Sequence, residues 1–306
     1  MLISVVIPVY NESDLIDDLY NAVMVAMLKF TNDFEVICVN DGSKDDTLLK
    51  LQLCHQKDKR FKVLNLSRNF GHQSAYTAGL NYAKGDYIAM MDGDLQDPPE
   101  LIASMYKCAI ENQSDVVYGR RTERHETFFK KLSIKLFHFI FNKLSNINAP
   151  ANVGNFSVMN RKALEAFLAL DEKNRYLPGL RFFIGFKQDY VDYSRDDRTI
   201  GEAKMNFSRL LKLALDALFS FSKLPIKICI YLGIIGVIFT LIGGSIVIYK
   251  KIAGDAITGW TSILVSMYFL GSVQLLFMGI IGEYVHRIFV ETQNRPIYIV
   301  KDYFED

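Results

Sequence analysis

The first 119 residues alternate short apolar runs, rich in β-branched residues, with stretches in which apolar positions recur every three or four residues. The first pattern is typical of buried strands and the second of amphipathic helices. Strands are predicted at Ile3–Val9, Phe34–Asn40, Phe61–Leu66, Tyr87–Met91 and Val116–Tyr118, with helices at 13–30, 45–57, 72–84 and 98–112. This alternation predicts an α/β domain with a mostly parallel sheet and helices on both faces.

Two long apolar runs without a charged residue lie farther along the chain, at Ile228–Tyr249 and Trp260–Gly282. At about 1.5 Å per residue, each can cross a hydrocarbon core of about 30 Å as a helix, so a transmembrane hairpin is predicted. Lys and Arg are more numerous beside its two outer ends than in its connecting loop, which predicts a cytoplasmic N-terminal domain. Glu283 lies four residues before Arg287, at the spacing of an ion pair on a helix.

Residues 126–147 place basic side chains beside one apolar helical face, formed by Phe129, Leu132, Leu136, Ile140, Leu144 and Ile147. This combination favours a helix at the membrane surface, near anionic headgroups, over a helix that packs into a core. A second such stretch, 207–221, leads toward the first long apolar run, where a plain linker is the alternative.

Charge and cysteine content argue against several classes of protein. The 306 residues include 35 Lys and Arg and 34 Asp and Glu, whereas nucleic-acid-binding domains are usually strongly basic. The four cysteines are far apart with no CxxC pair, so neither a disulfide framework nor a zinc site is expected, and a reducing cytoplasm is the simplest setting. The first apolar stretch is short and follows no basic region, as expected of a strand and not of a signal peptide.

Polar residues follow three predicted strands, in the segments Asn11-Glu12, Asn40-Asp41-Gly42-Ser43 and Asp92-Gly93-Asp94. Each segment alone could be an ordinary turn or helix cap. Asp97-Pro98 could likewise mark the start of a helix, with proline in its first turn. The carboxyl ends of parallel strands meet at one edge of a sheet, so these segments should converge. Asp92 and Asp94 would repel each other unless a cation compensates, and Mg²⁺ or Mn²⁺ bound in this way typically also binds substrate phosphates.

Four ordered segments, VVIPVYNE, VNDGSKDDT, NLSRNFGHQSA and MDGDLQDPPE, resemble the successive motifs of family-2 glycosyltransferases with the Rossmann-like GT-A fold. The LQDPPE segment and the two apolar runs resemble the polyprenyl-phosphate glycosyltransferases in particular, such as bactoprenol glucosyltransferases and dolichol-phosphate mannose synthases. The resemblance implies metal-dependent, inverting transfer of a hexose from a UDP-sugar to undecaprenyl phosphate. The reaction would take place at the cytoplasmic face of the bacterial inner membrane and serve envelope glycan modification.

The resemblance also implies roles by position. Residues at or after the ends of the strands would bind the nucleotide, namely Pro8, Tyr10, Glu12, Asp41, Ser67 and Asp92. Asp41 would face the base. Asp94 and Gln96 would coordinate Mg²⁺ or Mn²⁺ on the diphosphate.

Further implied groups act on the leaving and accepting phosphates. Arg198 and Lys204 lie in a segment similar to a loop that closes over the diphosphate, and they would stabilise the leaving charge. The implied acceptor-phosphate residues are Arg120, Arg121, Lys131 and Ser133. The expected catalytic set is Asp92, Asp94, Asn155, Arg198 and Lys204.

One segment departs from the family pattern. Where many relatives have a DxGDF-like sequence, this chain has Asn152-Val153-Gly154-Asn155-Phe156, with amides in place of both acids. An acceptor phosphate monoester has a second pKa near 6 and is largely ionised at neutral pH, so it needs positioning more than deprotonation. We therefore expect Asn155 to orient a substrate, with no carboxylate base required.

The expected organisation is a cytoplasmic GT-A domain at 1–204, an amphipathic juxtamembrane helix at 205–227, two transmembrane helices at 228–289 and a cytoplasmic tail at 290–306. Alternatives are a donor such as UDP-GlcNAc or GDP-mannose, a processive polysaccharide synthase, or a catalytically impaired membrane scaffold. The lack of a QxxRW segment disfavours the synthase, and the paired aspartates disfavour the scaffold. The pairs Gly233/Gly236 and Gly279/Gly282 would let spans pack closely in a homo-oligomer.

Overall fold

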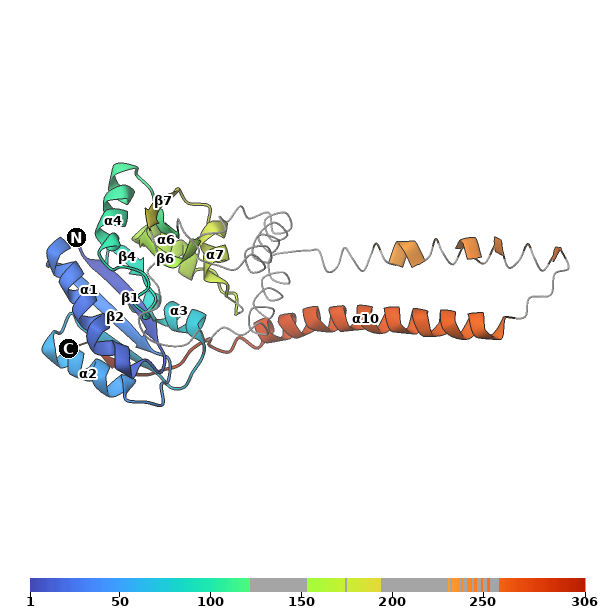
Figure 1. Ribbon diagram of the computed structural model, residues 1–306, viewed down its shortest axis with the longest axis horizontal. Coiled ribbons are helices and arrows are strands. Elements are labelled where there is room, and N and C mark those ends of the chain that lie inside the picture. The colour runs from blue at the N-terminus through green and yellow to red at the C-terminus, as the bar shows by residue number, and fades with distance from the viewer. Residues whose placement is uncertain are drawn as a thin grey trace. The chain divides into compact units, whose positions relative to one another are not determined.

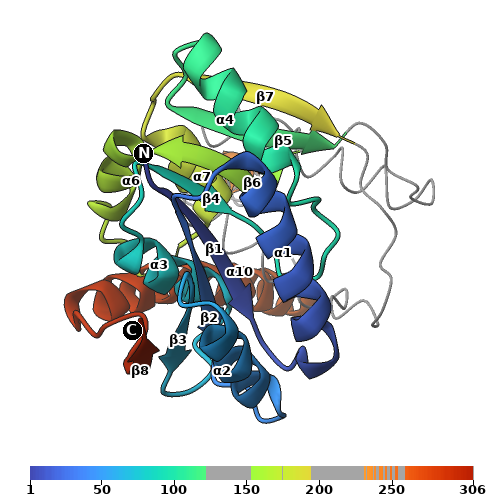
Figure 2. The same cartoon turned by 90° about the vertical axis from the view of Figure 1, so that its left-hand side faces the viewer.

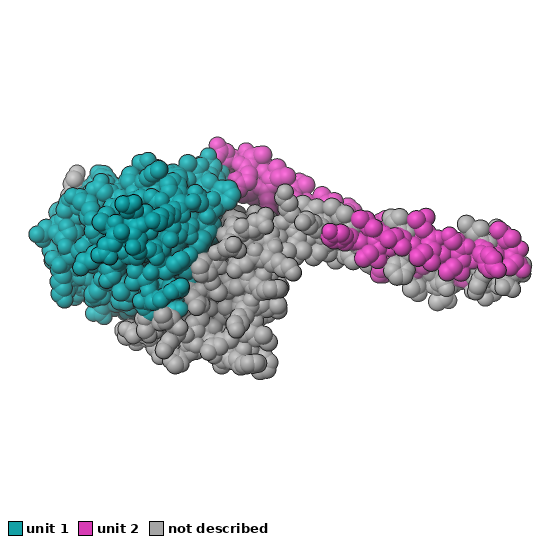
Figure 3. All heavy atoms as spheres, turned by 90° about the horizontal axis from the view of Figure 1, so that it is seen from above, with its two compact units in different colours: residues 1–143, 147–210, 296–306 teal, residues 144–146, 211–295 magenta. Residues whose placement is uncertain are grey.

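The structure is a computed structural model that describes residues 1–121, 153–173, 175–193 and 259–305, and short stretches between 231 and 253 (Figure 1). The chain divides into two compact units. The first contains residues 1–143, 147–210 and 296–306, and the second contains residues 144–146 and 211–295 (Figure 3).

The first unit is built on one sheet of eight strands in the order β7-β5-β6-β4-β1-β2-β3-β8 (Figure 2). The strands are β1 (Ile3–Val9), β2 (Phe34–Asn40), β3 (Phe61–Leu66), β4 (Tyr87–Met90), β5 (Val116–Arg121), β6 (Val153–Asn160), β7 (Gln188–Tyr193) and β8 (Val300–Phe304). Strand β1 is parallel to β2 and β4, β2 to β3, and β5 to β7. Strands β6 and β8 run antiparallel to their neighbours, so the sheet is mixed.

Helices cover both faces of this sheet. They are a 3₁₀ turn, η1 (Ser13–Leu15), and the α-helices α1 (Ile16–Phe30), α2 (Thr47–Lys57), α3 (His72–Tyr82), α4 (Leu101–Glu111), α6 (Arg161–Leu168) and α7 (Leu177–Phe183). Apolar residues of α1, α2 and α4 share one core with alternate residues of β1, from Ile3 to Val9. Helix α3 packs on the opposite face, where a Cβ at Gly79 would collide with Val6 and lie 2.8 Å from Val39.

The central strands form where the sequence predicts them. Every residue of β1 and β2 is buried, because helices cover both faces, and such strands have continuous apolar runs in place of alternation. The bounds of β1, β2 and β3 agree with the predicted ranges. Strand β5 extends to Arg121, three residues beyond its predicted end. The α/β fold class with a mostly parallel sheet is confirmed.

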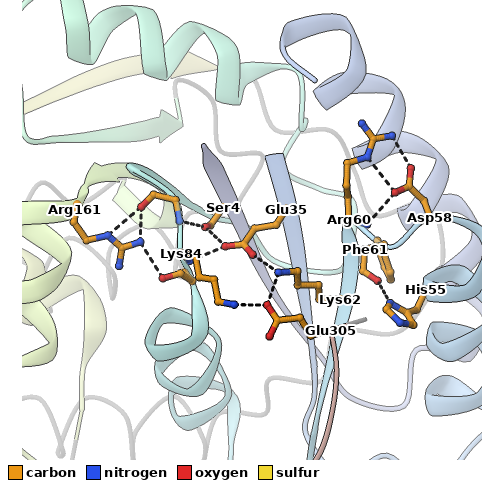
Figure 4. A network of polar contacts seen from close by, with 12 residues as sticks. Ser4, Glu35, His55, Asp58, Arg60, Phe61, Lys62, Lys84, Arg161 and Glu305 are labelled. Atoms are coloured by element: carbon orange, nitrogen blue, oxygen red, sulfur yellow. Dashed lines mark hydrogen bonds and ion pairs between the residues drawn. The ribbon is translucent and has the colours of Figure 1, made fainter. Parts of the chain in front are cut away.

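The outer strand β8 lies within 290–306, a segment expected only as a tail. It pairs antiparallel with β3 and is joined to it by an ionic network (Figure 4). Lys62 Nζ contacts Glu305 Oε1 and Glu35 Oε2, each at 2.8 Å, and Lys84 Nζ lies 2.5 Å from Glu305 Oε1. The buried Glu35 also accepts a hydrogen bond of 2.6 Å from Ser4 Oγ, which links the tail to β1 and β2.

The second unit contains α10 (Trp260–Thr292), which spans the second predicted apolar run and continues ten residues beyond it. Its residues Ser266–Thr292 are long and apolar enough to cross a membrane, and no other helix of the described residues meets that criterion. The first predicted span is described only in short helical stretches between Tyr231 and Tyr249, and the hairpin is not confirmed. The predicted ion pair is confirmed, since Arg287 Nε donates to Glu283 Oε1 at 2.8 Å.

Candidate active site

The turns after β1, β2 and β4 meet at the carboxyl edge of the sheet. Val9 at the end of β1 is paired in register with Asn40 at the end of β2. A Cβ at Gly93, just after β4, would lie 2.8 Å from Val9 Cγ1 and 3.1 Å from Pro8 O. The Asp92-Gly93-Asp94 segment therefore lies directly against the end of β1, and the predicted convergence of these segments is observed.

Hydrogen bonds join the turn after β1 to the turn after β2. Asn11 has φ of 51°, a left-handed conformation that asparagine tolerates, and its N–H donates to Ser43 Oγ at 2.9 Å. Its side-chain Oδ1 accepts from Lys44 N, also at 2.9 Å. Glu12 N donates to Thr47 Oγ1 at 3.0 Å. The half-buried Tyr10 and Glu12 are thereby held beside the Asp41-Gly42-Ser43 turn.

Asp41 holds the loop that follows β3. Its Oδ1 accepts from Phe70 N at 2.7 Å and its Oδ2 from Gly71 N at 2.9 Å. Burial raises the pKa of Asp41, although these two N–H donors oppose the shift. Gly42, at φ of 65°, lies so close to the backbone of Arg68 that a Cβ would collide with it. The loop that begins at Ser67 is therefore fixed over the end of β2.

Two side chains of α3 hold Asp92, a residue assigned to the nucleotide and to catalysis. The hydroxyl of Tyr76, whose ring is fully buried, donates to Asp92 Oδ1 at 2.7 Å. His72 Nε2 lies 3.3 Å from the same oxygen. Burial opposes protonation of His72, but its hydrogen bond to Asp92 and the charges of Asp92, Asp41 and Asp94 raise its pKa overall. Neither role was predicted from the sequence, although an i, i+4 pair at the start of a helix that follows a strand-end loop was a usable signal.

Asp94 and Gln96 form the rim of the turn after β4. Leu95 between them has φ of 56°, and Gln96 N donates to Asp94 Oδ1 at 3.3 Å. Both side chains are half-exposed. No group of three or more His, Cys, Asp and Glu suited to a metal occurs among the described residues. Two oxygen ligands fit a hard divalent cation that takes its other ligands from a diphosphate and water, the usual mode for Mg²⁺.

Asp97 is not the start of a helix, and that interpretation is wrong. Its side chain is fully buried and accepts from Tyr193 Oη at 2.5 Å, while α4 begins at Leu101. Arg121 Nη2 lies 3.7 Å from Asp97 Oδ1, and Arg121 Nε donates to Tyr193 Oη at 3.2 Å. This buried cluster ties the turn after β4 to the ends of β5 and β7.

The two arginines that were assigned together to the acceptor phosphate lie on opposite faces of the sheet, as successive residues of a strand must. Arg120 forms a bidentate ion pair with Asp192, in which Nε donates to Oδ1 at 2.5 Å and Nη2 donates to Oδ2 at 2.8 Å. Arg121 lies on the face of Asp97, and its Nη2 would be 3.1 Å from a Cβ at Gly154. Only Arg121 therefore lies beside the turn after β4.

Asn155 is held through its backbone by Arg181, which the sequence analysis did not identify. Arg181 is fully buried and donates to Gly154 O and Asn155 O at 2.7 Å each, and to Ser157 Oγ. Burial lowers the pKa of Arg181. The Asn155 Oδ1 atom is buried and has no hydrogen-bond partner among the described residues. A single arginine in the apolar LPGLRFF segment was the only local signal.

Four of the assigned residues lie outside the described residues: Lys131, Ser133, Arg198 and Lys204. The predicted surface helix at 126–147 and the predicted juxtamembrane helix at 205–227 lie entirely outside them as well.

Residues 4–168 match the family model described as Glycosyl transferase family 2. An uncharacterized glycosyltransferase of Synechocystis sp. is 41% identical over 98% of this chain and 95% of its own length. A prophage bactoprenol glucosyl transferase homolog of Escherichia coli is 36% identical over 98% of this chain and 99% of its own. The crystal structure of glucosyl-3-phosphoglycerate synthase from Mycobacterium tuberculosis with Mn²⁺, UDP and phosphoglyceric acid aligns over 71% of this chain and 76% of that chain, with a TM-score of 0.49 and 16% identity.

Proposed function

The chain belongs to glycosyl transferase family 2, and we propose that it transfers a hexose from a UDP-sugar to a polyprenyl phosphate such as undecaprenyl phosphate. The single observation that carries this proposal is the convergence of three strand ends, with Asp41, Asp92 and Asp94, at one edge of the sheet. A relative named bactoprenol glucosyl transferase, 36% identical over 98% of this chain, supports the lipid acceptor.

The donor would bind across this edge. Pro8, Tyr10, Glu12 and Ser67 would border the nucleoside, with Asp41 facing the base while it fixes the neighbouring loop. Asp92, oriented by Tyr76 and His72, would face the sugar diphosphate. Asp94 and Gln96 would hold Mg²⁺ or Mn²⁺, which when bound neutralises charge on the diphosphate. Arg198 and Lys204 would add positive charge to the same group.

The acceptor phosphate would approach from the side of Arg121, with Lys131 and Ser133 as further contacts. Arg120 is already paired with Asp192, so we assign the main contact to Arg121. A phosphate oxygen attacks the anomeric carbon as the bond to the nucleoside diphosphate breaks, which inverts the configuration there. An α-linked UDP-sugar thus gives a β-linked lipid phosphate.

Asn155 would orient a substrate and would not accept a proton. Its buried Oδ1, with no partner among the described residues, can receive a hydrogen bond from a sugar hydroxyl. An amide is sufficient because the nucleophile is already largely ionised at neutral pH. If Asn155→Ala keeps turnover within about threefold of wild type, or about 0.65 kcal/mol, the orienting role is wrong.

We place the reaction at the cytoplasmic face of a bacterial plasma membrane, with the chain anchored by two spans and its product used for envelope glycans. The apolar helix α10 supports a membrane anchor. The excess of Lys and Arg beside the outer ends of the two apolar runs supports the orientation.

The decisive experiment uses the full chain in detergent or nanodiscs with labelled undecaprenyl phosphate and a panel of UDP-glucose, UDP-GlcNAc and GDP-mannose. Mg²⁺-dependent formation of a labelled lipid phosphate-sugar, abolished by EDTA and by Asp94→Asn, supports the proposal. Product from UDP-GlcNAc or GDP-mannose alone would change the donor and leave the acceptor class intact. The absence of product together with no nucleotide-dependent thermal stabilisation would favour the scaffold.

A further inference from the structure

Three polar side chains lie side by side across the neighbouring strands β2, β3 and β8. The register pairs Asn40 of β2 with Asn65 of β3, and Asn65 with Asp302 of β8. Paired residues of neighbouring strands point to the same face, so the three side chains form one row. The row begins in the segment that follows α10 and ends where β2 meets the proposed nucleotide site.

A continuous series of hydrogen bonds joins Asp302, Asn65 and Asn40 to the turn at Ser43. Asn65 Nδ2 donates to Asp302 Oδ2 at 2.8 Å, and Asn40 Nδ2 donates to Asn65 Oδ1 at 2.9 Å. Asn40 Oδ1 in turn accepts from Ser43 N at 3.2 Å. Ser43 Oγ accepts from Asn11 N at 2.9 Å, so the row reaches the turns after both β2 and β1.

The two ends of the row fix the direction of both amides between them. An ionised carboxylate only accepts hydrogen bonds, and a backbone N–H only donates them. Asn65 must therefore present its NH₂ group to Asp302 and its oxygen to Asn40, which leaves the Asn40 oxygen for Ser43 N. Asn40 is fully buried and Asn65 nearly so, and a buried amide without its partner is costly.

A second contact ties the same segment to the loop after β3. Ser67 N donates to Ile299 O at 2.9 Å, one residue before β8 begins. The register of β3 and β8 also shifts between Asn65 and Leu66, at the point where β3 leads into this loop. The segment at 299–302 thus contacts the backbone beside two parts of the proposed nucleotide site.

We infer that Asp302 is a positioning residue for the donor nucleotide, acting through Asn65 and Asn40 on the turn at Ser43. This inference rests on the proposed function, because it takes the strand-end turns as the nucleotide site. Asp302 does not touch the substrate. Its carboxylate holds the amide row in the one orientation that supports these turns. Its loss leaves Asn65 Nδ2 without an acceptor, so the Asn65 amide can rotate, which weakens its hydrogen bond to Asn40 and the support of the Ser43 turn.

The structure supplies a control directly after the same strand. Glu305 also anchors β8, but through Lys62 and Lys84 (Figure 4), and its ion pairs do not involve Asn40, Asn65 or Asp302. Asp302→Ala removes the row's acceptor, whereas Glu305→Ala weakens only the attachment of the strand. Asp302→Asn keeps an oxygen that can accept from Asn65 and serves as the conservative variant.

The test measures Kd for UDP and GDP with Mg²⁺ on the full chain in detergent, together with KM for donor and acceptor and the thermal unfolding temperature. Asp302→Ala should raise the nucleotide Kd and the donor KM about tenfold, or about 1.4 kcal/mol, and leave the acceptor KM unchanged. Asp302→Asn should restore Kd to within about threefold. Glu305→Ala should lower the unfolding temperature and leave Kd within about twofold.

A folded Asp302→Ala protein with wild-type Kd would overturn the inference, as would a Glu305→Ala protein with the same rise in Kd. If Asp302→Ala does not fold, Asp302→Ser replaces it. The serine side chain is too short to reach Asn65, so the same rise in nucleotide Kd is expected. A wild-type protein that binds neither UDP nor GDP would refute the proposed function itself, which is a distinguishable result.

Discussion

Two buried tyrosines allow the effect of the hydrogen bond from Tyr76 to Asp92 to be measured against a matched control. Tyr76 donates its hydroxyl hydrogen to Asp92 Oδ1 at 2.7 Å, whereas the buried Tyr118 hydroxyl has no hydrogen-bond partner among the described residues. Phenylalanine at either position keeps the ring and its packing. The two substitutions therefore differ in whether a hydrogen bond to a carboxylate is lost.

A hydrogen bond to a charged group contributes about 1.5–3 kcal/mol. The Asp92 side chain is 23% exposed, so water can replace part of the bond and the lower end of that range applies. Tyr76→Phe should lower the free energy of unfolding by about 1.5 kcal/mol, or about 3–6 °C in the unfolding temperature of a domain this size. If Asp92 needs this orientation to act on the donor, kcat/KM for the nucleotide sugar should fall about tenfold.

The assay compares thermal unfolding and donor kcat/KM for wild type, Tyr76→Phe and Tyr118→Phe in the same detergent. Tyr118→Phe should match wild type in activity and be equally or slightly more stable, because a buried hydroxyl without a partner is removed. Equal behaviour of the two variants in both measurements would refute the claim that Tyr76 orients Asp92.

Three further outcomes are expected. Asp97→Asn removes the anion beside the largely buried Arg121 and should lower the free energy of unfolding by about 3 kcal/mol. The measurement is chemical denaturation, and an unchanged denaturation midpoint would show that the cluster of Asp97, Arg121 and Tyr193 contributes nothing to stability. Arg181→Met removes the donors to Gly154 O and Asn155 O and should lower kcat while leaving the nucleotide Kd within about twofold; a selective loss of nucleotide binding would contradict this. The pKa of His72 is raised above its ordinary value of 6.5, so its contribution to stability is full below about pH 6.5 and is lost as the pH rises through the raised pKa. The stability difference between wild type and His72→Gln should shrink over that range, and a difference that grows with pH would reverse the sign of the argument.

The central strands were predictable because their signal is local. Ile3–Val9, Phe34–Asn40 and Phe61–Leu66 are almost entirely buried, so most of their residues are apolar, and polar residues mark their ends. Strand β8 has the sequence VKDYF, with two charged residues in five. Its stability comes from pairing with β3 and from the contacts of Glu305, made with residues more than two hundred positions away, which no local pattern reveals.

The candidate site likewise contains residues that local sequence patterns predict and residues that depend on long-range contacts. Its positions at the strand ends followed from the sheet and the motifs, and Asp41, Asp92 and Asp94 converge as predicted. Asp97 was misread because Asp before Pro is a local helix-start signal, whereas its actual partner, Tyr193, is 96 residues away. Arg181 was missed for a similar reason, since its hydrogen bonds to β6 exist only after the chain has folded.

The place of β8 at the outer edge of the sheet has a consequence for the order of folding. This strand leaves the ribosome after α10, so β1 to β7 are synthesised while the backbone groups of β3 on that side still lack a partner. An uncovered edge strand can pair with another chain. A shortened protein that stops before the apolar segments would keep this exposed edge permanently, and its yield should improve when residues 296–306 are joined back to it through a flexible linker.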